Sequence, residues 1–195
     1  MWSCVRCGDM KKIINEFRPA IICVLIFTIL CGVLYTGVIT GIAQVFFHNK
    51  ANASIITISL KDGADIKIGS ELIAQEFTKK EYLIGRPLGT SNLSTSSKEL
   101  RQIVEERISW WHNFDPDNAA DIPMDLVYAS GSGVDPNISV EAARYQVRRI
   151  AEARGVSEKA VEDIITRYTT GRFLGIFGEP TVNVLKVNLA LDGKL

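Results

Sequence analysis

The feature that most constrains this chain is an apolar stretch without a charged residue, which runs from Pro19 to Phe47. It contains roughly 29 residues, and about 20 helical residues are enough to cross the hydrocarbon core of a bilayer. A secretory signal peptide is the alternative, because Ala51 and Ala53 have the spacing of a cleavage site. The apolar part of a signal peptide has only about 7 to 15 residues, so the sequence predicts an uncleaved membrane anchor instead.

The basic residues that flank this helix predict its orientation in the membrane. Four precede it and two follow it closely: Arg6, Lys11, Lys12 and Arg18 on one side, Lys50 and Lys61 on the other. Lysine and arginine concentrate on the cytoplasmic side of membrane helices. We therefore expect a cytoplasmic segment over residues 1–18, a transmembrane helix over 19–47 and an extracytoplasmic domain over 48–195.

Small residues recur along the predicted helix and indicate a face for helix packing. They are Thr28, Gly32, Thr36, Gly37, Thr40 and Gly41. Glycine is frequent in membrane helices generally, and a single GxxxG pair is weak evidence by itself. Two adjoining rows of small residues, however, allow the backbone of a neighbouring helix to approach closely. We expect these rows to pack against a partner in the membrane.

The charge balance and the cysteines argue against two further classes of protein. The chain has 22 basic and 22 acidic side chains, so it lacks the long-range positive field on which nucleic-acid binding relies. The 4 cysteines all precede residue 32, so the remaining domain must fold on its apolar core without disulfides. Cys4 and Cys7 have the spacing of a zinc-ligand pair, but no second pair or histidine lies near them, so we expect no metal site.

The predicted extracytoplasmic domain contains segments with the periods of both strands and helices. Residues Ile55 to Leu60 alternate between apolar and polar, as a half-buried strand does. Four helices are expected: over 70–77, from Ser96 past Trp111, from Ser139 to Arg154 and from Ser157 to Gly171. Glu99 follows Ser96 at the spacing of a capping box.

A closing strand is expected over Val182 to Leu191. Its apolar residues change phase near Val184, which a β-bulge there would explain. Strands at both ends with helices between them predict an α+β domain, and the sequence leaves open whether the first and last strands pair. The fold expected for the whole chain is therefore an α+β extracytoplasmic domain anchored by one N-terminal transmembrane helix.

The motifs of common catalytic and metal sites are missing from the sequence. It contains no phosphate-binding P-loop, no GxGxxG after a strand and no HExxH. Ser130 and Ser132 lie in a glycine-rich loop that lacks the GxSxG pattern of a nucleophile elbow. Acidic residues such as Asp115 and Asp125 lack the spacing of a calcium loop and are expected to be solvated. We expect no catalytic residue and no bound metal in this chain.

Three motifs, in contrast, form together a long and specific pattern. They span Ala129–Ser139, Tyr145–Val147 and Gly178–Pro180. With these motifs in this order, the chain resembles the C subunit of the bacterial potassium-transporting Kdp ATPase. The resemblance covers nearly all residues from Arg18 to Asp192.

The resemblance implies a single-pass, non-catalytic subunit of a complex in the bacterial inner membrane. Its partners would be a channel-like A subunit that binds potassium and a B subunit that is a P-type ATPase. Such a C subunit would assist assembly and act as a catalytic chaperone that raises the ATP affinity of the B subunit. ATP, magnesium and potassium would belong to the partner subunits. An accessory role agrees with the lack of a DKTG phosphorylation motif in the sequence.

The sequence departs from the family pattern in two places. The segment between Gly85 and Ser91 is shorter than usual and lacks a Ser-Gly-Gly motif, and Arg148 stands where proline is common. The first departure argues against a role of this segment in nucleotide binding.

The expected orientation also separates the domain from ATP, which is cytoplasmic. An effect on ATP affinity would then have to be transmitted through the membrane helices. We expect Ser130, Ser132, Asp135 and Gln146 either to contact a partner subunit or to support the fold. A stand-alone, membrane-anchored extracytoplasmic binding or sensor module is the alternative function, and an anchored hydrolase is a third.

Overall fold

A computed structural model describes the backbone of residues 5–59, 63 and 65–195 and, within these ranges, the side chains from Glu16 onward. The predictions that concern Cys4, Leu60 and Lys61, and the side chains of Arg6, Cys7, Lys11 and Lys12, lie outside the described residues. The chain divides into two compact units, Met1–Asn52 and Ala53–Leu195. Each unit is described by itself below.

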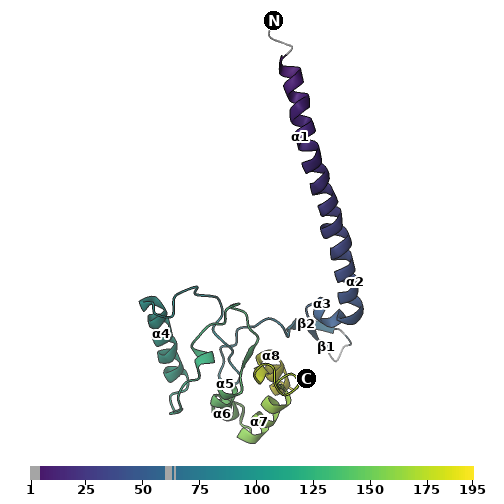
Figure 1. The fold of residues 1–195 in the computed structure, drawn as a ribbon. Coiled ribbons are helices and arrows are strands. Elements are labelled where there is room, and N and C mark those ends of the chain that lie inside the picture. Colours follow the sequence, from purple (N-terminus) through teal and green to yellow (C-terminus); the bar gives the residue numbers. More distant parts are fainter. Residues whose placement is uncertain (1–4, 60–62, 64) are drawn as a thin grey trace. The chain divides into compact units, whose positions relative to one another are not determined.

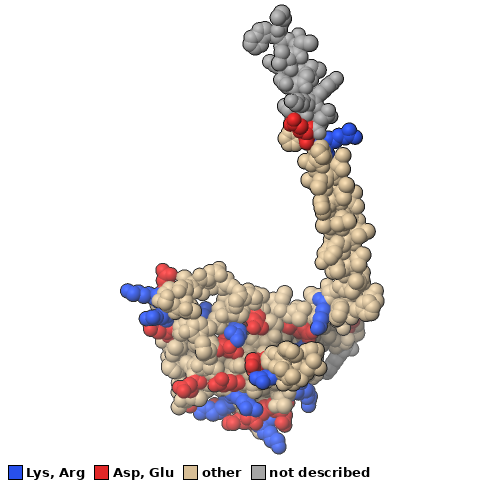
Figure 2. Space-filling view, viewed as in Figure 1, with Lys and Arg blue, Asp and Glu red and all other residues tan. Residues whose placement is uncertain are grey.

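The first unit is a long helix (Figure 1). It consists of α1 (Val5–Phe27), the π-helix η1 (Thr28–Tyr35) and α2 (Thr36–Phe46), and the short helix α3 (His48–Ala51) follows. From Glu16 to Phe46 it is long and apolar enough to cross a membrane, and Figure 2 shows an uncharged surface along it beyond the charged side chains at its start. The predicted apolar helix is therefore confirmed, and its helical structure begins earlier than expected, at Val5.

The second unit begins with an antiparallel hairpin of β1 (Ile55–Ser59) and β2 (Asp65–Ser70). Of the pairings that the sequence left open, the described residues show β1 paired with its neighbour β2 and not with the last segment of the chain. The helix expected over 70–77 is wrong. The backbone there bonds to distant residues instead: Ala74 N donates to Val134 O at 2.9 Å, and Asn183 Nδ2 donates to Glu71 O at 2.9 Å.

Among the described residues, the second sheet has three strands in the order β3, β5, β4. They are β3 (Asn137–Ser139), β5 (Thr181–Asn183) and β4 (Thr169–Thr170), and both pairings are antiparallel. Ile138 lies opposite Val182 in this sheet, and both are buried. The mixture of helices and sheets confirms the α+β character of the domain.

Serine caps begin three of the helices, as predicted, although one boundary differs by a residue. In α4 (Lys98–Phe114) the cap is Ser97, not Ser96, and its side chain accepts a hydrogen bond from Leu100 N. Ser139 and Ser157 cap α5 (Val140–Tyr145) and α7 (Glu158–Arg167) in the same way. α6 (Val147–Arg154) continues from α5 and ends at Gly155, which adopts φ 66°.

The expected closing strand is wrong beyond Asn183. Only residues Thr181–Asn183 form β5, and Val184–Leu191 forms the helix α8. Asn183 caps this helix, because its side-chain oxygen accepts a hydrogen bond from Lys186 N at 3.0 Å. The change of phase near Val184 therefore marks the passage from strand to helix and not a β-bulge. β1 and β2 instead carry the irregular register, between Ile56 and Thr57.

The apolar core of the second unit joins the three-stranded sheet to α4–α8, to the loop at residue 83 and to Leu126 and Val127. Its buried members are Leu83, Trp111, Leu126, Val127, Ile138, Ala142, Ala143, Tyr145, Val147, Ile150, Ala151, Val161, Ile165, Val182, Val184 and Val187. The core thus reaches from residue 83 almost to the C-terminal end, so the loops described next are fixed by residues far away in the sequence.

Candidate functional site

Residues 80–86, here called the clamped segment, belong to no helix or strand, and their first residues form a turn in which Tyr82 N donates to Lys79 O at 3.2 Å. Two amide side chains hold the middle of this segment. Gln146, between α5 and α6, accepts a hydrogen bond from Ile84 N at 2.9 Å and donates to Ile84 O at 2.9 Å. Asn188 of α8 makes the same pair of bonds with Leu83, at 2.7 and 2.9 Å. The amide groups thus replace the strand partner that this segment lacks.

Two arginines hold the start of the clamped segment. Arg149 is buried and donates to the backbone oxygens of Lys80 and Tyr82, and it also donates to Gln146 Oε1 at 2.6 Å. Arg154 donates to Glu81 O at 2.7 Å. Burial lowers the pKa of Arg149 to about 10, which still leaves its guanidinium protonated near neutral pH.

Asp192 connects the C-terminal end of the chain to the same segment. Its carboxylate accepts hydrogen bonds from Arg154 Nη2 at 2.9 Å and from the Tyr82 hydroxyl at 3.1 Å. Burial alone would raise the pKa of Asp192, but these hydrogen bonds and the positive charges of Arg154 and Lys194 lower it by more, so the net pKa lies below its ordinary value. The carboxylate is therefore charged at neutral pH and contributes to stability there.

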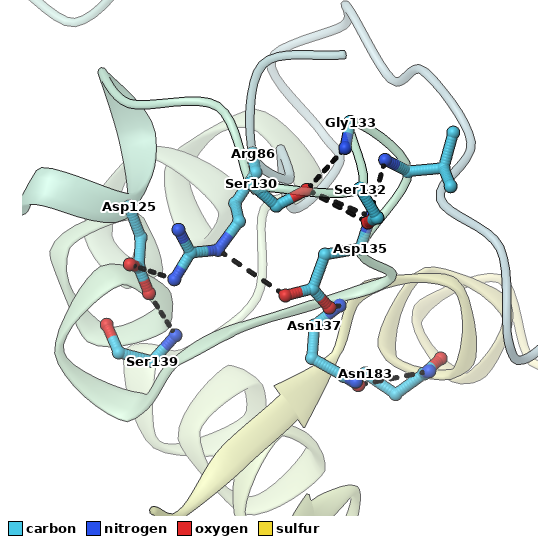
Figure 3. Close-up of polar contacts among 10 residues, drawn as sticks. Arg86, Asp125, Ser130, Ser132, Gly133, Asp135, Asn137, Ser139 and Asn183 are labelled. Atoms are coloured by element: carbon cyan, nitrogen blue, oxygen red, sulfur yellow. Dashed lines mark hydrogen bonds and ion pairs between the residues drawn. The ribbon is translucent and has the colours of Figure 1, made fainter. Parts of the chain in front are cut away.

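Arg86, at the end of the clamped segment, lies between two carboxylates (Figure 3). Its Nη2 donates to Asp125, and its Nε lies 3.8 Å from Asp135 Oδ2. Asp125 also accepts a hydrogen bond from Ser139 N at 2.7 Å. The ion pair therefore joins the clamped segment to η2 (Met124–Leu126) and to the start of α5. Asp125 was expected to be solvated, and that prediction is wrong.

The predicted site residues Ser130, Ser132 and Asp135 build one turn (Figure 3). Ser130 Oγ accepts a hydrogen bond from Gly133 N at 2.9 Å and lies 3.2 Å from Ser132 Oγ. Asp135 Oδ1 accepts one from Asn137 N at 3.0 Å. These side chains therefore shape the loop in the structure.

Gly133 brings this turn against the loop at Gly89. Its φ is +71°, and a Cβ atom there would lie 2.7 Å from the backbone carbon of Gly89. The carbonyl oxygen of Gly133 also accepts a hydrogen bond from Gly89 N at 2.9 Å. Only glycine combines this backbone conformation with this close approach.

Gln146, the fourth predicted site residue, is fully buried, at 0% relative exposure. The turn at 130–135 and Gln146 meet the same clamped segment, at Arg86 and Ile84 respectively. The structure thus brings the predicted residues together around one segment. Of the two roles expected for Gln146, its contacts favour support of the fold.

An apolar cavity of about 190 Å³ lies beside the clamped segment. Its walls include Ile84, Arg86 and, from α4, Arg107 and Trp110. Typical pockets for small organic ligands have volumes of roughly 300–1,000 Å³, so this cavity is small for a nucleotide. Arg107 donates to Val127 O at 2.7 Å, and burial lowers its pKa. Within the described residues, no group of three or more His, Cys, Asp or Glu side chains could hold a metal ion.

The small residues of the anchor lie on the exposed surface of the first unit. Thr28 and Gly32 fall within the π-helix η1, in which hydrogen bonds run between residues five apart. Thr36 follows it and donates its hydroxyl to Cys31 O at 2.9 Å. A Cβ atom at Gly37 or Gly41 would meet nothing within 4 Å. Thr40 is exposed as well, so this face is open to a neighbouring helix.

Several residues around the clamped segment were not predicted from the sequence. They are Arg86, Arg149, Arg154, Asn188 and Asp192. A signal existed for Asn188, because it is the one amide within an otherwise apolar run from Val187 to Leu191. A polar side chain at such a position is buried and needs a partner. The arginines carry no comparable signal, since arginine on a helix is usually solvated.

Comparison with known proteins gives one consistent result. The model of the family "K+-transporting ATPase, c chain" (KdpC) matches residues 17–193. The potassium-transporting ATPase KdpC subunit of Listeria monocytogenes is 55% identical over 186 residues, which cover 94% of this chain and 98% of that protein. The KdpC subunit of Clostridium perfringens is 50% identical, with coverage of 91% and 97%. The KdpC subunit of Clostridium botulinum is 44% identical, with coverage of 95% and 100%.

Replacing Gln146 by leucine tests the role of the amide in the clamped segment. Gln146→Leu preserves much of the side-chain volume but leaves both polar groups of the Ile84 backbone without this partner. We expect the free energy of unfolding to fall by roughly 2–4 kcal/mol. Unfolding of the detergent-purified chain by denaturant, followed by tryptophan fluorescence, measures the change because Trp111 is buried. Gln102→Leu, on the exposed face of α4, is the control; an equal loss there would contradict the assignment.

Replacing Gly133 by alanine tests the close approach of the two loops. Gly133→Ala must place a Cβ atom against the Gly89 backbone at a positive φ. We expect a loss of at least about 2 kcal/mol in the free energy of unfolding. Gly131→Ala is the matched control, because a Cβ atom at Gly131 meets nothing within 4 Å, and it should change stability by less than about 0.5 kcal/mol. Equal stabilities of the two variants would show that the loops do not meet in this way.

Proposed function

This chain belongs to the KdpC family of K+-transporting ATPase subunits, and from that premise we propose that it is a non-catalytic accessory subunit of the complex. One observation carries the proposal: the family match begins at residue 17, at the start of the candidate membrane span, and continues to residue 193. The anchor and the globular unit therefore both belong to the family pattern. An accessory subunit of a membrane complex needs a segment that contacts its partners in the membrane and a folded domain, and this chain has both.

We propose that the partners are the channel-like A subunit, which binds potassium, and the P-type ATPase B subunit. The row of small residues from Thr28 to Gly41 supports this assignment, because it leaves a face of the anchor open to close helix packing. Potassium, magnesium and ATP would then be bound by the partners. The role of this chain would be to assist assembly and to raise the affinity of the B subunit for ATP.

We propose that the globular unit lies outside the cytoplasm, an orientation that the basic residues before the anchor favour. The contacts of the candidate residues are compatible with this, because Gln146 is buried and Ser130, Ser132 and Asp135 bond within their own turn. An increase in ATP affinity would then reach the cytoplasm as coupling between conformational states of the assembled complex. Such coupling is reciprocal, so ATP would tighten the association of this chain with its partners by the same factor.

Co-purification tests the accessory role. The full chain, tagged at its C-terminus and produced with the larger Kdp subunits in potassium-starved cells, should recover both subunits in mild detergent together with potassium-stimulated ATPase activity. The chain purified alone should show no ATPase activity. Recovery of a lone chain while the pump is present in the same membranes would contradict the proposal and favour a stand-alone sensor module.

Labelling from outside the cell tests the orientation. In a background without the natural cysteines, Lys159→Cys places a thiol on the exposed surface of α7. A maleimide that cannot cross membranes should label it in intact cells, whereas a chain retaining only Cys7 should be labelled only after permeabilisation. The reverse pattern would place the domain in the cytoplasm, where it could contact ATP directly.

A further inference from the structure

A short hairpin between β4 and β5 exposes an unusual amount of apolar surface. Its side chains Phe173, Leu174, Ile176 and Phe177 have relative exposures of 71%, 74%, 74% and 63%. Single exposed apolar residues are common on soluble domains, but a contiguous group of four large ones is not. We call residues 173–177 the apolar hairpin. Such a group indicates a surface that is covered in the working state.

The apolar hairpin has a defined shape. Phe173 N donates to Phe177 O at 2.8 Å, and Phe177 N donates to Phe173 O at 2.9 Å. At its base, Arg172 donates to both carboxylate oxygens of Glu179, at 3.0 and 2.8 Å. The turn is therefore closed by backbone bonds and by an ion pair, so its apolar side chains are presented from a fixed frame.

The backbone at the tip is unfavourable for the residue that occupies it. Leu174 has φ +52°, a conformation that is costly for a leucine, and Gly175 follows with φ +75°. Because the Leu174 side chain is exposed, no buried contact within the chain repays this cost. Backbone strain of this kind is typical of binding positions, where the conformation presents a side chain to a partner.

The chemistry of the apolar hairpin distinguishes between its two plausible partners. Membrane-surface anchors usually combine apolar residues with tryptophan or tyrosine and with free basic residues. Residues 173–178 contain neither, and the adjacent Arg172 is neutralised by Glu179. A fixed, strained tip also gives no advantage in a fluid lipid layer, whereas it suits a groove of matching shape. These properties favour a protein groove over lipid.

The anchor limits where such a groove is found. Only residues 47–52 connect the candidate span to the globular unit, a length of at most about 20 Å even if fully extended. With the candidate span in the membrane, as the proposed function requires, the start of the globular unit at Ala53 cannot be farther than this from the membrane surface.

We propose that the apolar hairpin docks into an uncharged apolar groove on a larger membrane-embedded subunit of the same complex. This inference rests on the proposed function, because it presupposes that the complex forms. Leu174 and Ile176, at the tip, act as the anchoring side chains. A few side chains that fill well-packed, desolvated pockets carry most of the binding free energy of an interface, and a protruding tip can fill such a pocket.

The first test replaces the anchors in the full chain, produced with its partner subunits. The double variant Leu174→Asn, Ile176→Asn removes the apolar tip, and asparagine tolerates a positive φ better than leucine does, so the fold should be preserved. We expect the recovery of larger subunits per tagged chain to fall about tenfold or more. The matched control is Met124→Asn, which removes an apolar side chain of 70% exposure from η2 and should leave recovery unchanged.

The second test identifies the occupant directly. A photoreactive benzoylphenylalanine in place of Phe177 should crosslink to a larger subunit in membranes, which mass spectrometry of the product identifies. Crosslinking to lipid alone or to a second copy of this chain would overturn the proposal, as would normal recovery with the double variant. If the unaltered chain recovers no larger subunit, the proposed function itself fails, so the two failures are distinguishable.

Discussion

Hydrogen bonds from buried side chains to the backbone of residues 82–84 hold the globular unit together. Gln146 and Asn188 each pair with both polar groups of one residue in this stretch, Ile84 and Leu83 respectively. Without these amides, four backbone groups would face the core unpaired, at a cost of about 1–3 kcal/mol each. Arg149 extends the same support to Tyr82. The apolar core around Leu83 forms only because these polar groups are satisfied.

The same arrangement links the functional candidates to the fold. The Arg86 side chain extends from the clamped segment, forms an ion pair with Asp125 and lies near Asp135. The position of the turn at 130–135 therefore depends on the position of that segment. The motif residues of this turn are thus neighbours of the network of buried hydrogen bonds around the clamped segment. A fully satisfied network of this kind makes the surrounding part of the domain rigid.

Local signals in the sequence predicted local structure well. Ser139, Ser157 and Gly155 delimit helices where the capping rules place them, and the long apolar run forms a helix as expected. Non-local contacts decided the rest. The stretch from 70 to 77 forms no helix because its backbone bonds to Val134 and Asn183, and Val184 begins a helix because Asn183 caps it. Within the site, Ile84, whose backbone pairs with the Gln146 amide, lies 62 residues away in the sequence, a separation that no local pattern reveals.

The pairing of Leu83 with Asn188 spans 105 residues, which has a consequence for biosynthesis. Residues 80–86 leave the ribosome long before α8 does, so they stay without their hydrogen-bond partners in α8 during that time. Contacts of such separation also slow folding, because a large loop must close before they contribute free energy. The nascent domain therefore passes through a period in which Leu83 is uncovered, until α8, which is synthesised about 105 residues later, supplies Asn188.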